Sequence, residues 1–390
     1  MIFVLRGTRR SLVDSLGRLA NPPPHPDHHI KRKDLPTMKA FVLKKPGVVG
    51  WHDAPEPSLV PYGAILAPVA MTPCSSDVHT VYGGGSPKAP NLILGHECVA
   101  RILEVGDQVR DFFPGEVVAV PAITPDWRAL AIQEGNDRHA GKPFSGHQLG
   151  RTQPGVFAER FLIPDADTTL AKIPQGVTLE QALMCVDTMT TGFTGAEYAD
   201  IKAGDTVVVL GIGPIGLMAV AGAAHMGAAR IIGVGTRPVC VDLAREYGAT
   251  DVISYRDGDV VEQVLDMTDG LGADGVIICG GGDEVFTQAV DMVRYGIGTV
   301  SNVNYYGGTG SIGYPKFSGG RGMAGKTIHM ELARGGRARI ERMLKMVQYR
   351  RVDPGKMVTH RLHGLDKVEE ALELMHHKPK DLVKVMVQND

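Results

Sequence analysis

A glycine-rich turn joins an apolar strand to a helix in the second half of this 390-residue chain. The expected strand covers 206–210 and the expected helix 217–226. The turn between them reads G-x-G-x-x-G through Gly211, Ile212, Gly213, Pro214, Ile215 and Gly216. This string alone is weak support among 49 glycines, but a strand before it and a helix after it are what pyrophosphate binding at a helix N-terminus requires. The turn therefore predicts a dinucleotide-binding unit.

Two different patterns of apolar residues along the chain predict two domains, and the length of the chain also favours two. Continuous apolar runs at 206–210, 230–234, 275–278 and 298–300 are typical of parallel strands buried on both faces. Shorter runs at 64–69, 98–105 and 116–120 alternate with turns and favour an antiparallel, barrel-like domain. The predicted fold class is α/β, with a doubly wound parallel sheet beside a mainly β domain.

Helices are expected where the two halves join and near the C-terminus. Thr178 and Gln181 form a capping-box pattern that starts a helix running through 185–186. A helix over 367–376 and a last strand over 382–387 follow, and we expect this tail to fold back onto the first domain.

Composition excludes several classes of protein. A formal net charge of −2 offers no polybasic surface for nucleic acid. Gly, Pro or a charge interrupts every apolar run before the roughly 20 residues needed to cross a bilayer. The five cysteines are scattered, which favours a reducing compartment, the cytoplasm, over a disulfide framework.

Residues 1–37 differ from the rest of the chain in being basic and proline-rich. An organelle transit peptide is one interpretation. A disordered tail, or a start codon set too early, is the one we favour, because a natural first strand begins at Met38.

The residues that follow the second expected parallel strand indicate whether the coenzyme is NAD or NADP. An NAD-specific protein usually places an acid here against the ribose 2′-hydroxyl, but this chain has Gly235, Thr236 and Arg237. A hydroxyl beside a guanidinium suits a 2′-phosphate and favours NADP, with an ordinary solvated arginine as the alternative. Tyr255 could stack on adenine or simply pack.

Four side chains from three separate stretches interrupt apolar or structured surroundings: Cys74, His96, Glu97 and Asp187. An unpaired buried carboxylate such as that of Asp187 costs several kcal/mol, and zinc would satisfy all four groups. With Cys74 and Asp187 ionised and His96 neutral, Glu97 is left as a displaceable fourth ligand at an open catalytic position. Zinc can lower the pKa of bound water from about 15.7 to about 7, and an alcohol there would lose its proton in the same way.

A proton path is expected from Ser76 and His79, one helical turn apart. The alternative is that Ser76 caps the helix and His79 is a surface residue. For the remaining candidates we expect surface or packing roles; these are His139, His147, His360, His363, His376 and His377.

Taken together, the motifs resemble the zinc-containing medium-chain alcohol dehydrogenases, most closely the NADP-dependent secondary-alcohol (isopropanol) dehydrogenases of bacteria and some protists. The resemblance runs from Met38 to about Val387. Its most specific stretches are 73–81 (PCSSDVHTV), 94–97 (LGHE), 122–128 (AITPDWR), 211–216 and 378–382 (KPKDL).

This resemblance implies a Rossmann NADP-binding domain over 191–331, inserted into a GroES-like zinc catalytic domain made of 38–190 and 332–390. It implies one catalytic zinc on Cys74, His96, Glu97 and Asp187, proton transfer by Ser76 and His79, and a homotetramer. It also implies coenzyme contacts beyond the glycine turn, from Gly235, Thr236, Arg237, Tyr255, Val303, Asn304, Tyr305 and Lys378.

Two departures from the family pattern matter. Many members carry a structural zinc on four clustered cysteines, whereas no cysteine occurs between Cys98 and Cys185, so we expect no second metal. Gap-free counting also places His147 where close relatives have a tryptophan in the substrate pocket, which predicts an altered pocket.

The predicted function is hydride transfer between NADP(H) and a small secondary alcohol or ketone, and aldehydes are further candidate substrates. An NAD-dependent polyol dehydrogenase is an alternative, but it requires an acid near Thr236. A non-catalytic NADPH-binding protein of the quinone-reductase type is another, but such proteins lack the four predicted zinc ligands.

Overall fold

The computed structural model describes residues 36–83, 91–140, 145–306 and 310–389. The segment 1–35, on which most of the expected N-terminal extension falls, lies outside these ranges. Residues 37–390 form one compact unit, so the expected domain boundaries at 190/191 and 331/332 remain a proposal. In the described part of the chain, no helix has both the length and the apolar character needed to cross a bilayer.

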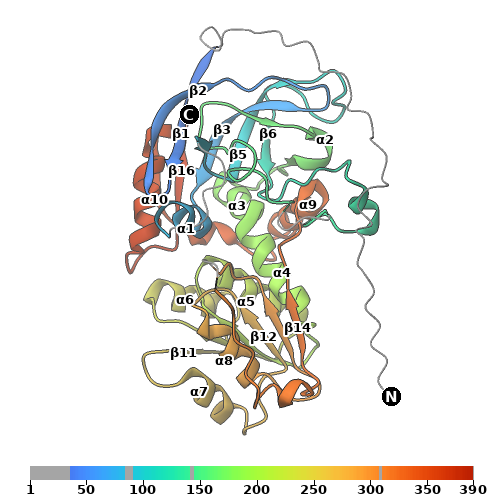
Figure 1. The fold of residues 1–390 in the computed structure, drawn as a ribbon, viewed down its shortest axis with the longest axis vertical. Helices are drawn as coiled ribbons and strands as arrows, with labels where there is room; N and C mark the ends of the chain where they lie inside the picture. The colour runs from blue at the N-terminus through green and yellow to red at the C-terminus, as the bar shows by residue number, and fades with distance from the viewer. Residues whose placement is uncertain (1–35, 84–90, 141–144, 307–309, 390) are drawn as a thin grey trace, which may run out of the picture. The chain divides into compact units, whose positions relative to one another are not determined.

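Six parallel strands form one sheet in the order β11-β10-β9-β12-β13-β14 (Figure 1). Their bounds are β9 Thr206–Leu210, β10 Arg230–Val234, β11 Asp251–Ile253, β12 Gly275–Ile278, β13 Thr299–Asn302 and β14 Thr327–Met330. Helices α5 Pro214–Met226, α6 Pro238–Glu246, α7 Val260–Met267 and α8 Glu284–Met292 connect them. The predicted doubly wound α/β sheet is confirmed.

The remaining strands form two mainly antiparallel sheets. The larger has the order β15-β16-β3-β5-β6-β8, with β7 also pairing β3, and the smaller has the order β2-β1-β4. In the larger sheet the strands are β3 Ala64–Thr72, β5 Glu97–Val105, β6 Val117–Val120, β7 Phe161–Ile163, β8 Ala171–Lys172, β15 Val358–His363 and β16 Lys384–Gln388. The smaller contains β1 Thr37–Lys45, β2 Val48–Pro55 and β4 Leu92–Ile93.

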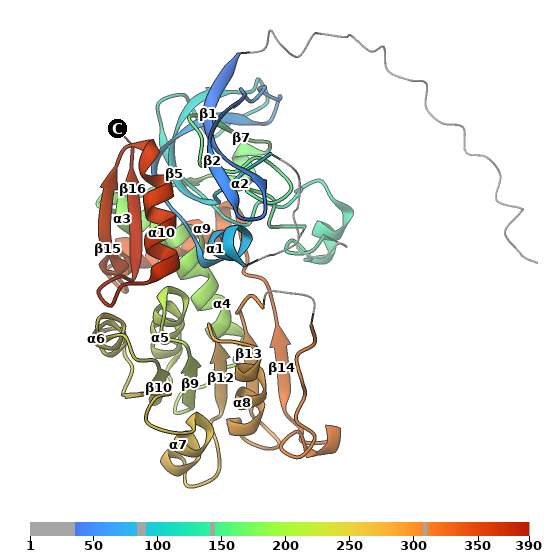
Figure 2. The ribbon, with the colours of Figure 1, turned by 60° about the vertical axis from the view of Figure 1, so that its left-hand side comes forward.

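The C-terminal tail completes the larger antiparallel sheet, because β16 pairs with β3. Helix α10 Val368–His377 precedes this strand, and α1 Ser75–Tyr82 packs against α10 (Figure 2). The prediction that the tail folds back onto the first domain is confirmed.

A run of short helices links the antiparallel sheets to the parallel sheet. It consists of α3 Leu179–Met184, a π-helical turn η2 Cys185–Met189 and α4 Thr190–Tyr198, which packs on α5. The capping box at the start of α3 forms as predicted, with the Thr178 N–H donating to Gln181 Oε1 at 3.1 Å and the Gln181 N–H to Thr178 Oγ1 at 3.3 Å. The π turn was not predicted; we expected the first helix to run through 185–186 and a second helix to follow 190–192.

Six further helical segments complete the described part of the chain. They are η1 Leu130–Glu134, α2 Ala166–Thr169, η3 Gly320–Gly322, α9 Gly336–Gln348, η4 Pro354–Met357 and η5 Leu365–Lys367. Helix α9 contacts α2, β8 and η2, so it braces the same junction.

The glycine-rich turn packs as tightly as its sequence predicts. Gly211 has a left-handed φ of +88°, and a Cβ added to Gly216 would lie 2.0 Å from the Gly211 carbonyl oxygen. Pro214 begins α5 and Gly227 ends it with φ +98°. The third glycine of the motif therefore allows α5 to start directly against the end of β9.

We predict that Gly216→Ala lowers the free energy of unfolding by about 1–3 kcal/mol, because the added methyl group meets backbone that cannot move independently. Gly213→Ala is the matched control, since Gly213 has a φ of −74° and open space around its Cβ position. It should change stability by less than about 0.5 kcal/mol. Urea unfolding without coenzyme measures both, and equal losses would contradict the packing described here.

Candidate active site

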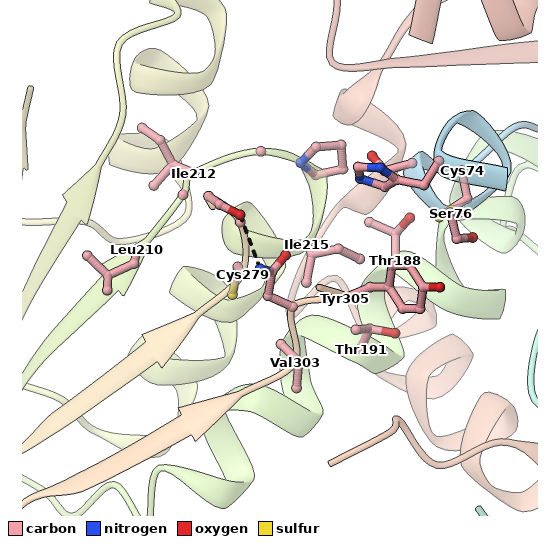
Figure 3. A pocket seen from close by; sticks show the side chains of 18 of the residues that line it. Cys74, Ser76, Thr188, Thr191, Leu210, Ile212, Ile215, Cys279, Val303 and Tyr305 are labelled. Carbon is pink, nitrogen blue, oxygen red and sulfur yellow. Dashed lines mark hydrogen bonds between the residues drawn. The ribbon is translucent and has the colours of Figure 1, made fainter. Parts of the chain in front are cut away.

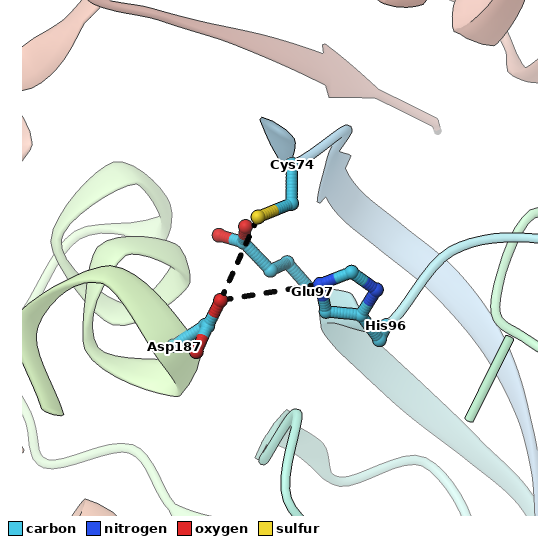
Figure 4. Close-up of side chains that lie close together, drawn as sticks. All are labelled: Cys74, His96, Glu97 and Asp187. Carbon is cyan, nitrogen blue, oxygen red and sulfur yellow. Dashed lines mark hydrogen bonds and ion pairs between the residues drawn. The ribbon is translucent and has the colours of Figure 1, made fainter. Parts of the chain in front are cut away.

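Four side chains with metal-binding groups converge at one end of the larger antiparallel sheet (Figure 4). The ligand atoms of Cys74, His96, Glu97 and Asp187 all lie within 4.8 Å of one another. Cys74 Sγ is 3.9 Å from Asp187 Oδ2, and His96 Nε2 is also 3.9 Å from that oxygen. The structure thus brings together the four residues that the sequence predicts as ligands.

Three separate segments supply these groups. Cys74 immediately precedes α1, and its N–H donates to Asp77 Oδ2 at 2.9 Å. Glu97 is the first residue of β5, and His96 immediately precedes it. Asp187 occupies the middle of the π turn η2, a helix irregularity that is frequent at functional sites.

The geometry suits a zinc ion. Zinc binds sulfur at about 2.3 Å and nitrogen or oxygen at about 2.0–2.2 Å, so tetrahedral ligand atoms lie roughly 3.3–3.7 Å apart. The 3.9 Å separations within the cluster are close to this spacing. Thiolate, imidazole and carboxylate are the groups that zinc binds in proteins, so the residues present fit the metal with small side-chain movements.

Asp77 orients His96, a role that sequence reasoning missed. Asp77 Oδ1 lies 3.6 Å from His96 Nδ1, and both side chains are 4% exposed. Burial lowers the pKa of His96, but the Asp77 carboxylate and Cys74 outweigh this and raise the pKa well above its ordinary value. A carboxylate behind a ligand histidine fixes its orientation and basicity, and metal binding there would release a proton.

Lys384 is the second residue that sequence reasoning missed. Its ammonium group lies 2.8 Å from Glu97 Oε1 and 3.0 Å from Oε2, with the two side chains 2% and 0% exposed. Burial lowers the pKa of Lys384, but the charges of Glu97 and Cys74 outweigh it, so the net pKa is raised and the group stays ionised. Lys384 therefore neutralises Glu97, as zinc would neutralise Cys74 and Asp187.

Ser76 and His79 both lie on α1 and face the cleft beside the cluster. Ser76 Oγ is 3.4 Å from His96 Nε2. Cys74, not Ser76, holds the N-cap position, so the capping alternative for Ser76 is wrong. His79 is exposed, and its pKa is lowered by partial burial and by the charge of Lys378, which favours the neutral, proton-accepting imidazole.

Three of the other histidines make contacts that show their roles. His147 lines the cleft, with its ring centroid 4.8 Å from that of His96 in an edge-to-face arrangement, so of the two expected roles it has the packing one. His139 Nε2 lies 3.1 Å from Glu331 Oε1. His376 stacks on Tyr82 with ring centroids 4.2 Å apart, in keeping with packing.

One cleft of about 1100 Å³ joins the four-residue cluster to the glycine-rich turn. In Figure 3, Cys74 and Ser76 lie at one end, Leu210 and Ile212 at the other, and Ile215 and Tyr305 between them. Of the residues predicted to contact coenzyme, all except Gly216 line it: Gly211, Ile212, Gly213, Pro214, Ile215, Gly235, Thr236, Arg237, Tyr255, Val303, Asn304, Tyr305 and Lys378. Gly216 contributes through packing instead.

The end of β10 suits a phosphorylated ribose. Thr236 Oγ1 and Tyr255 Oη lie 3.0 Å apart, and the Arg237 guanidinium donates to the Leu382 carbonyl. A Cβ on Gly213 would meet only Arg237, at 3.8 Å, which leaves room for a pyrophosphate beside the N-terminus of α5. Tyr255 is 56% exposed, so the packing alternative for this residue is wrong.

A parallel sheet with a glycine-rich turn, joined by one cleft to a cluster of thiolate, imidazole and carboxylates, defines a metal-dependent dehydrogenase. Residues 62–175 match the family model described as the alcohol dehydrogenase GroES-like domain, and residues 214–348 match that of the zinc-binding dehydrogenases. The chain belongs to the zinc-binding alcohol dehydrogenase family.

Curated relatives and solved structures agree with this family. The chain is 50% identical over 350 residues to the NADP-dependent isopropanol dehydrogenase of Thermoanaerobacter brockii, covering 90% of this chain and 99% of the relative. It is 46% identical over 352 residues to the NADP-dependent isopropanol dehydrogenase of Entamoeba histolytica, covering 90% of this chain and 96% of the relative. The zinc-dependent alcohol dehydrogenase 2 of Streptococcus pneumonia superposes with a TM-score of 0.81 at 25% identity, over 90% of this chain and 99% of that one. An alcohol dehydrogenase from Thermus sp. ATN1 superposes with a TM-score of 0.77 at 26% identity, over 90% of this chain and 100% of that one.

We predict that Lys384→Met lowers the free energy of unfolding of the metal-free protein by about 3–5 kcal/mol, because it leaves the Glu97 carboxylate buried without a counter-charge. The double variant Lys384→Met/Glu97→Gln should recover most of the loss. Lys367→Met, which removes the exposed pair with Glu370, is the control and should cost less than about 1 kcal/mol. Urea unfolding with a chelator present measures all three. Similar losses in the two single variants would contradict the role given to Lys384.

Proposed function

We propose that this enzyme interconverts small secondary alcohols and ketones, with NADP(H) as coenzyme and one catalytic zinc ion per chain. The observation that carries the proposal is the single cleft with the four-residue cluster at one end and the glycine-rich turn at the other. A substrate oxygen at the cluster and a nicotinamide extending from the turn would meet within this cleft. The names of the relatives from T. brockii and E. histolytica support the same choice of coenzyme and substrate class.

Zinc held by Cys74, His96, Glu97 and Asp187 would supply Lewis acidity to the substrate oxygen, and NADP would accept the hydride. The protein's own residues then manage the proton. The Ser76 hydroxyl lies next to the cluster and can relay the proton that an alcohol releases, accepting it while giving up its own hydroxyl proton toward His79. His79, exposed and favoured in its neutral form, can pass that proton to solvent.

The two alternatives are less well supported. An NAD-dependent polyol dehydrogenase needs an acid after β10, where this chain places Thr236 beside Tyr255 and Arg237 beside the cleft. A non-catalytic NADPH-binding protein has no use for a converged set of metal-binding groups, and Cys74, His96, Glu97 and Asp187 form such a set.

The absence of a structural zinc is part of the proposal. Within the described ranges, one group of His, Cys, Asp and Glu has the spacing to hold a metal ion. The other four cysteines are free and separate, three of them buried and Cys279 partly so. These free thiols also support the proposed location in the cytoplasm.

The proposal is tested by assaying a panel of ketones and aldehydes with NADPH and NADH in parallel, alongside metal analysis. We expect reduction of small ketones with NADPH preferred, about one zinc per chain, and at least a ~100-fold loss of turnover with reduced zinc content in Asp187→Ala. Asp200→Ala, at an exposed ion pair with Lys202, is the control and should behave like the wild type. Zinc-free protein with full activity, or full turnover in Asp187→Ala, would overturn the proposal.

We also propose a homotetramer, supported by an apolar surface along the β14 edge of the parallel sheet. Phe317 is 90% exposed, Met323 83% and Ile297 66%. These residues belong to neighbouring segments, since the Gly296 N–H donates to the Ala324 carbonyl at 2.9 Å and the Tyr295 hydroxyl to the Phe317 carbonyl at 3.2 Å. Large exposed apolar patches mark interaction sites.

Light scattering on the full chain should therefore give the mass of four chains. We predict that Phe317→Glu/Met323→Glu yields smaller species, because the charges would be buried in the contact between copies. Val48→Glu/Leu59→Glu, at exposed apolar residues of the antiparallel part of the molecule, is the control and should keep the wild-type mass. A monomeric wild type would exclude the tetramer.

A further inference from the structure

Helix α9 lies beside α4 and contacts it through one side chain that is mostly buried, that of Arg339 (Figure 1). Arg339 Nε donates to Thr190 Oγ1 at 2.8 Å, and Nη2 donates to the Thr190 carbonyl at 3.2 Å and to Thr194 Oγ1 at 3.3 Å. Nη1 donates to Glu197 Oε1 at 2.6 Å. The three partners are four and three residues apart, so they share one face of α4. All three guanidinium nitrogens are therefore bonded to this helix.

The Asp187 carboxylate divides its two oxygens between a hydrogen bond and the cluster (Figure 4). Thr191 Oγ1 donates to Asp187 Oδ1 at 2.9 Å. Asp187 Oδ2 lies 3.9 Å from Cys74 Sγ and 3.9 Å from His96 Nε2. The direction in which Oδ2 faces therefore depends on where Thr191 holds Oδ1.

Thr190 connects Arg339 to this hydrogen bond. It is the first residue of α4, it directly precedes Thr191, and it is buried. Its Oγ1 accepts from Arg339 Nε and donates to the Arg334 carbonyl at 3.1 Å. The side chain and the carbonyl of Thr190 are both bonded to α9 or to the segment before it, so the start of α4 cannot rotate without breaking several hydrogen bonds.

The π turn Cys185–Met189 makes the orientation of Asp187 sensitive to that support. π-helical turns are rare and occur mostly as single turns within α-helices. A regular α-helix advances by about 100° per residue. If the extra residue of the turn were lost to a regular helix, Asp187 would rotate by about that angle relative to α4 and would leave the cluster.

Helix α9 is itself fixed to the antiparallel part of the molecule. The Gly336 N–H donates to the Ile123 carbonyl at 3.2 Å, and a Cβ added to Gly335 would lie 2.2 Å from the same oxygen. Gly336 has a φ of +74°, and a Cβ there would lie 2.3 Å from Trp127 Cζ2. Arg339 therefore ties α4 to the part of the molecule that carries the other three predicted ligands.

We propose that Arg339 is a positioning residue, which fixes the first turn of α4 and thereby holds the Asp187 carboxylate toward the metal. A guanidinium has five N–H donors in a planar fork, so it can bond a hydroxyl, a carbonyl and a carboxylate together, which an ammonium group cannot do in the same geometry. Residues that orient metal ligands typically change metal affinity by about 10- to 100-fold. This inference rests on the proposed zinc centre and deepens it by naming a residue outside the cleft that controls it.

Two variants separate positioning from stability. Arg339→Lys keeps the positive charge beside Glu197 but loses the fork of bonds to Thr190 and Thr194, so zinc affinity should fall by about 10-fold or more. Glu197→Gln removes the ion pair but leaves the bonds from Arg339 to Thr190. It should lower the urea midpoint of unfolding and keep the wild-type zinc affinity.

Arg337→Lys is the matched control, because Arg337 lies on the same helix and pairs with Asp111 and Glu341. Zinc affinity is measured on the full chain by competition with a chromophoric chelator. Cobalt(II) in place of zinc gives a second measurement, since its visible absorption depends on the geometry of its ligands. Arg339→Lys should change the cobalt spectrum, whereas Glu197→Gln and Arg337→Lys should give the wild-type spectrum and affinity.

A double-mutant cycle tests the route from Arg339 to Asp187. Thr191→Val removes the donor to Asp187 Oδ1 and should weaken zinc binding by itself. Combined with Arg339→Lys, the loss should be smaller than the product of the two single losses, because both changes release the same carboxylate. A loss equal to the product would overturn the route. If Arg339→Lys does not fold, Thr190→Val takes its place, since it removes the Oγ1 acceptor and keeps the ion pair with Glu197.

The outcomes separate this inference from the proposed function. A wild-type zinc affinity and cobalt spectrum in Arg339→Lys, or an equal loss of affinity in Glu197→Gln, would overturn the inference. Ketone reduction by the zinc-loaded wild type with NADPH would then leave the proposed function standing. A wild type that binds neither zinc nor cobalt and reduces no ketone would defeat the proposed function itself.

Discussion

The buried ion pair of Glu97 and Lys384 is the interaction on which the active site depends. Three acidic groups, Cys74, Glu97 and Asp187, come together in one place, and taking even one ion out of water costs several kcal/mol unless a partner compensates it. Lys384 supplies one such compensation from β16, 287 positions along the chain from Glu97. The last strand, which pairs with β3, is therefore needed for the antiparallel part of the molecule to hold its buried charges.

The π turn at Cys185–Met189 links the chemistry to the junction between the two sheet systems. It places Asp187 in the cluster, where Thr191 Oγ1 donates to Asp187 Oδ1 at 2.9 Å, and it brings Thr188 Oγ1 within 3.4 Å of Glu97 Oε2. The helix that follows, α4, packs on α5, which carries the glycine-rich turn at its start. A displacement of α4 would therefore move a predicted ligand and the coenzyme site together, so one short segment sets the distance between them.

Much of this molecule could be predicted from its sequence, and the reasons for the misses are physical. Strands β9, β10 and β12 follow directly from continuous apolar runs, and the four converging groups stood out because each interrupts an apolar or structured stretch. Lys384 also interrupts an apolar stretch, the expected last strand. A single lysine in a strand is, however, equally typical of a solvated edge residue. The orientation of Asp77 toward His96 and the π turn at Asp187 depend on tertiary packing, which leaves no local pattern. His147 was placed in the pocket by the resemblance, while its spacing to other histidines indicated only packing.

The distribution of charge in the cleft indicates that the residues of the cluster and the residues that select a ligand are different ones. With Lys384 balancing Glu97 and a divalent ion balancing Cys74 and Asp187, the cluster contributes little net charge to the cleft. The field that a ligand meets is then set by charged side chains outside the cluster, and Arg151, Arg237, Glu331 and Lys378 are among those that line the cleft. Because low dielectric surroundings strengthen such fields, a substitution at one of these positions can change which ligand binds without altering how the cluster is assembled. On this view the choice of ligand depends on the residues that line the cleft outside the cluster, whereas the proposed reaction type depends on Cys74, His96, Glu97 and Asp187.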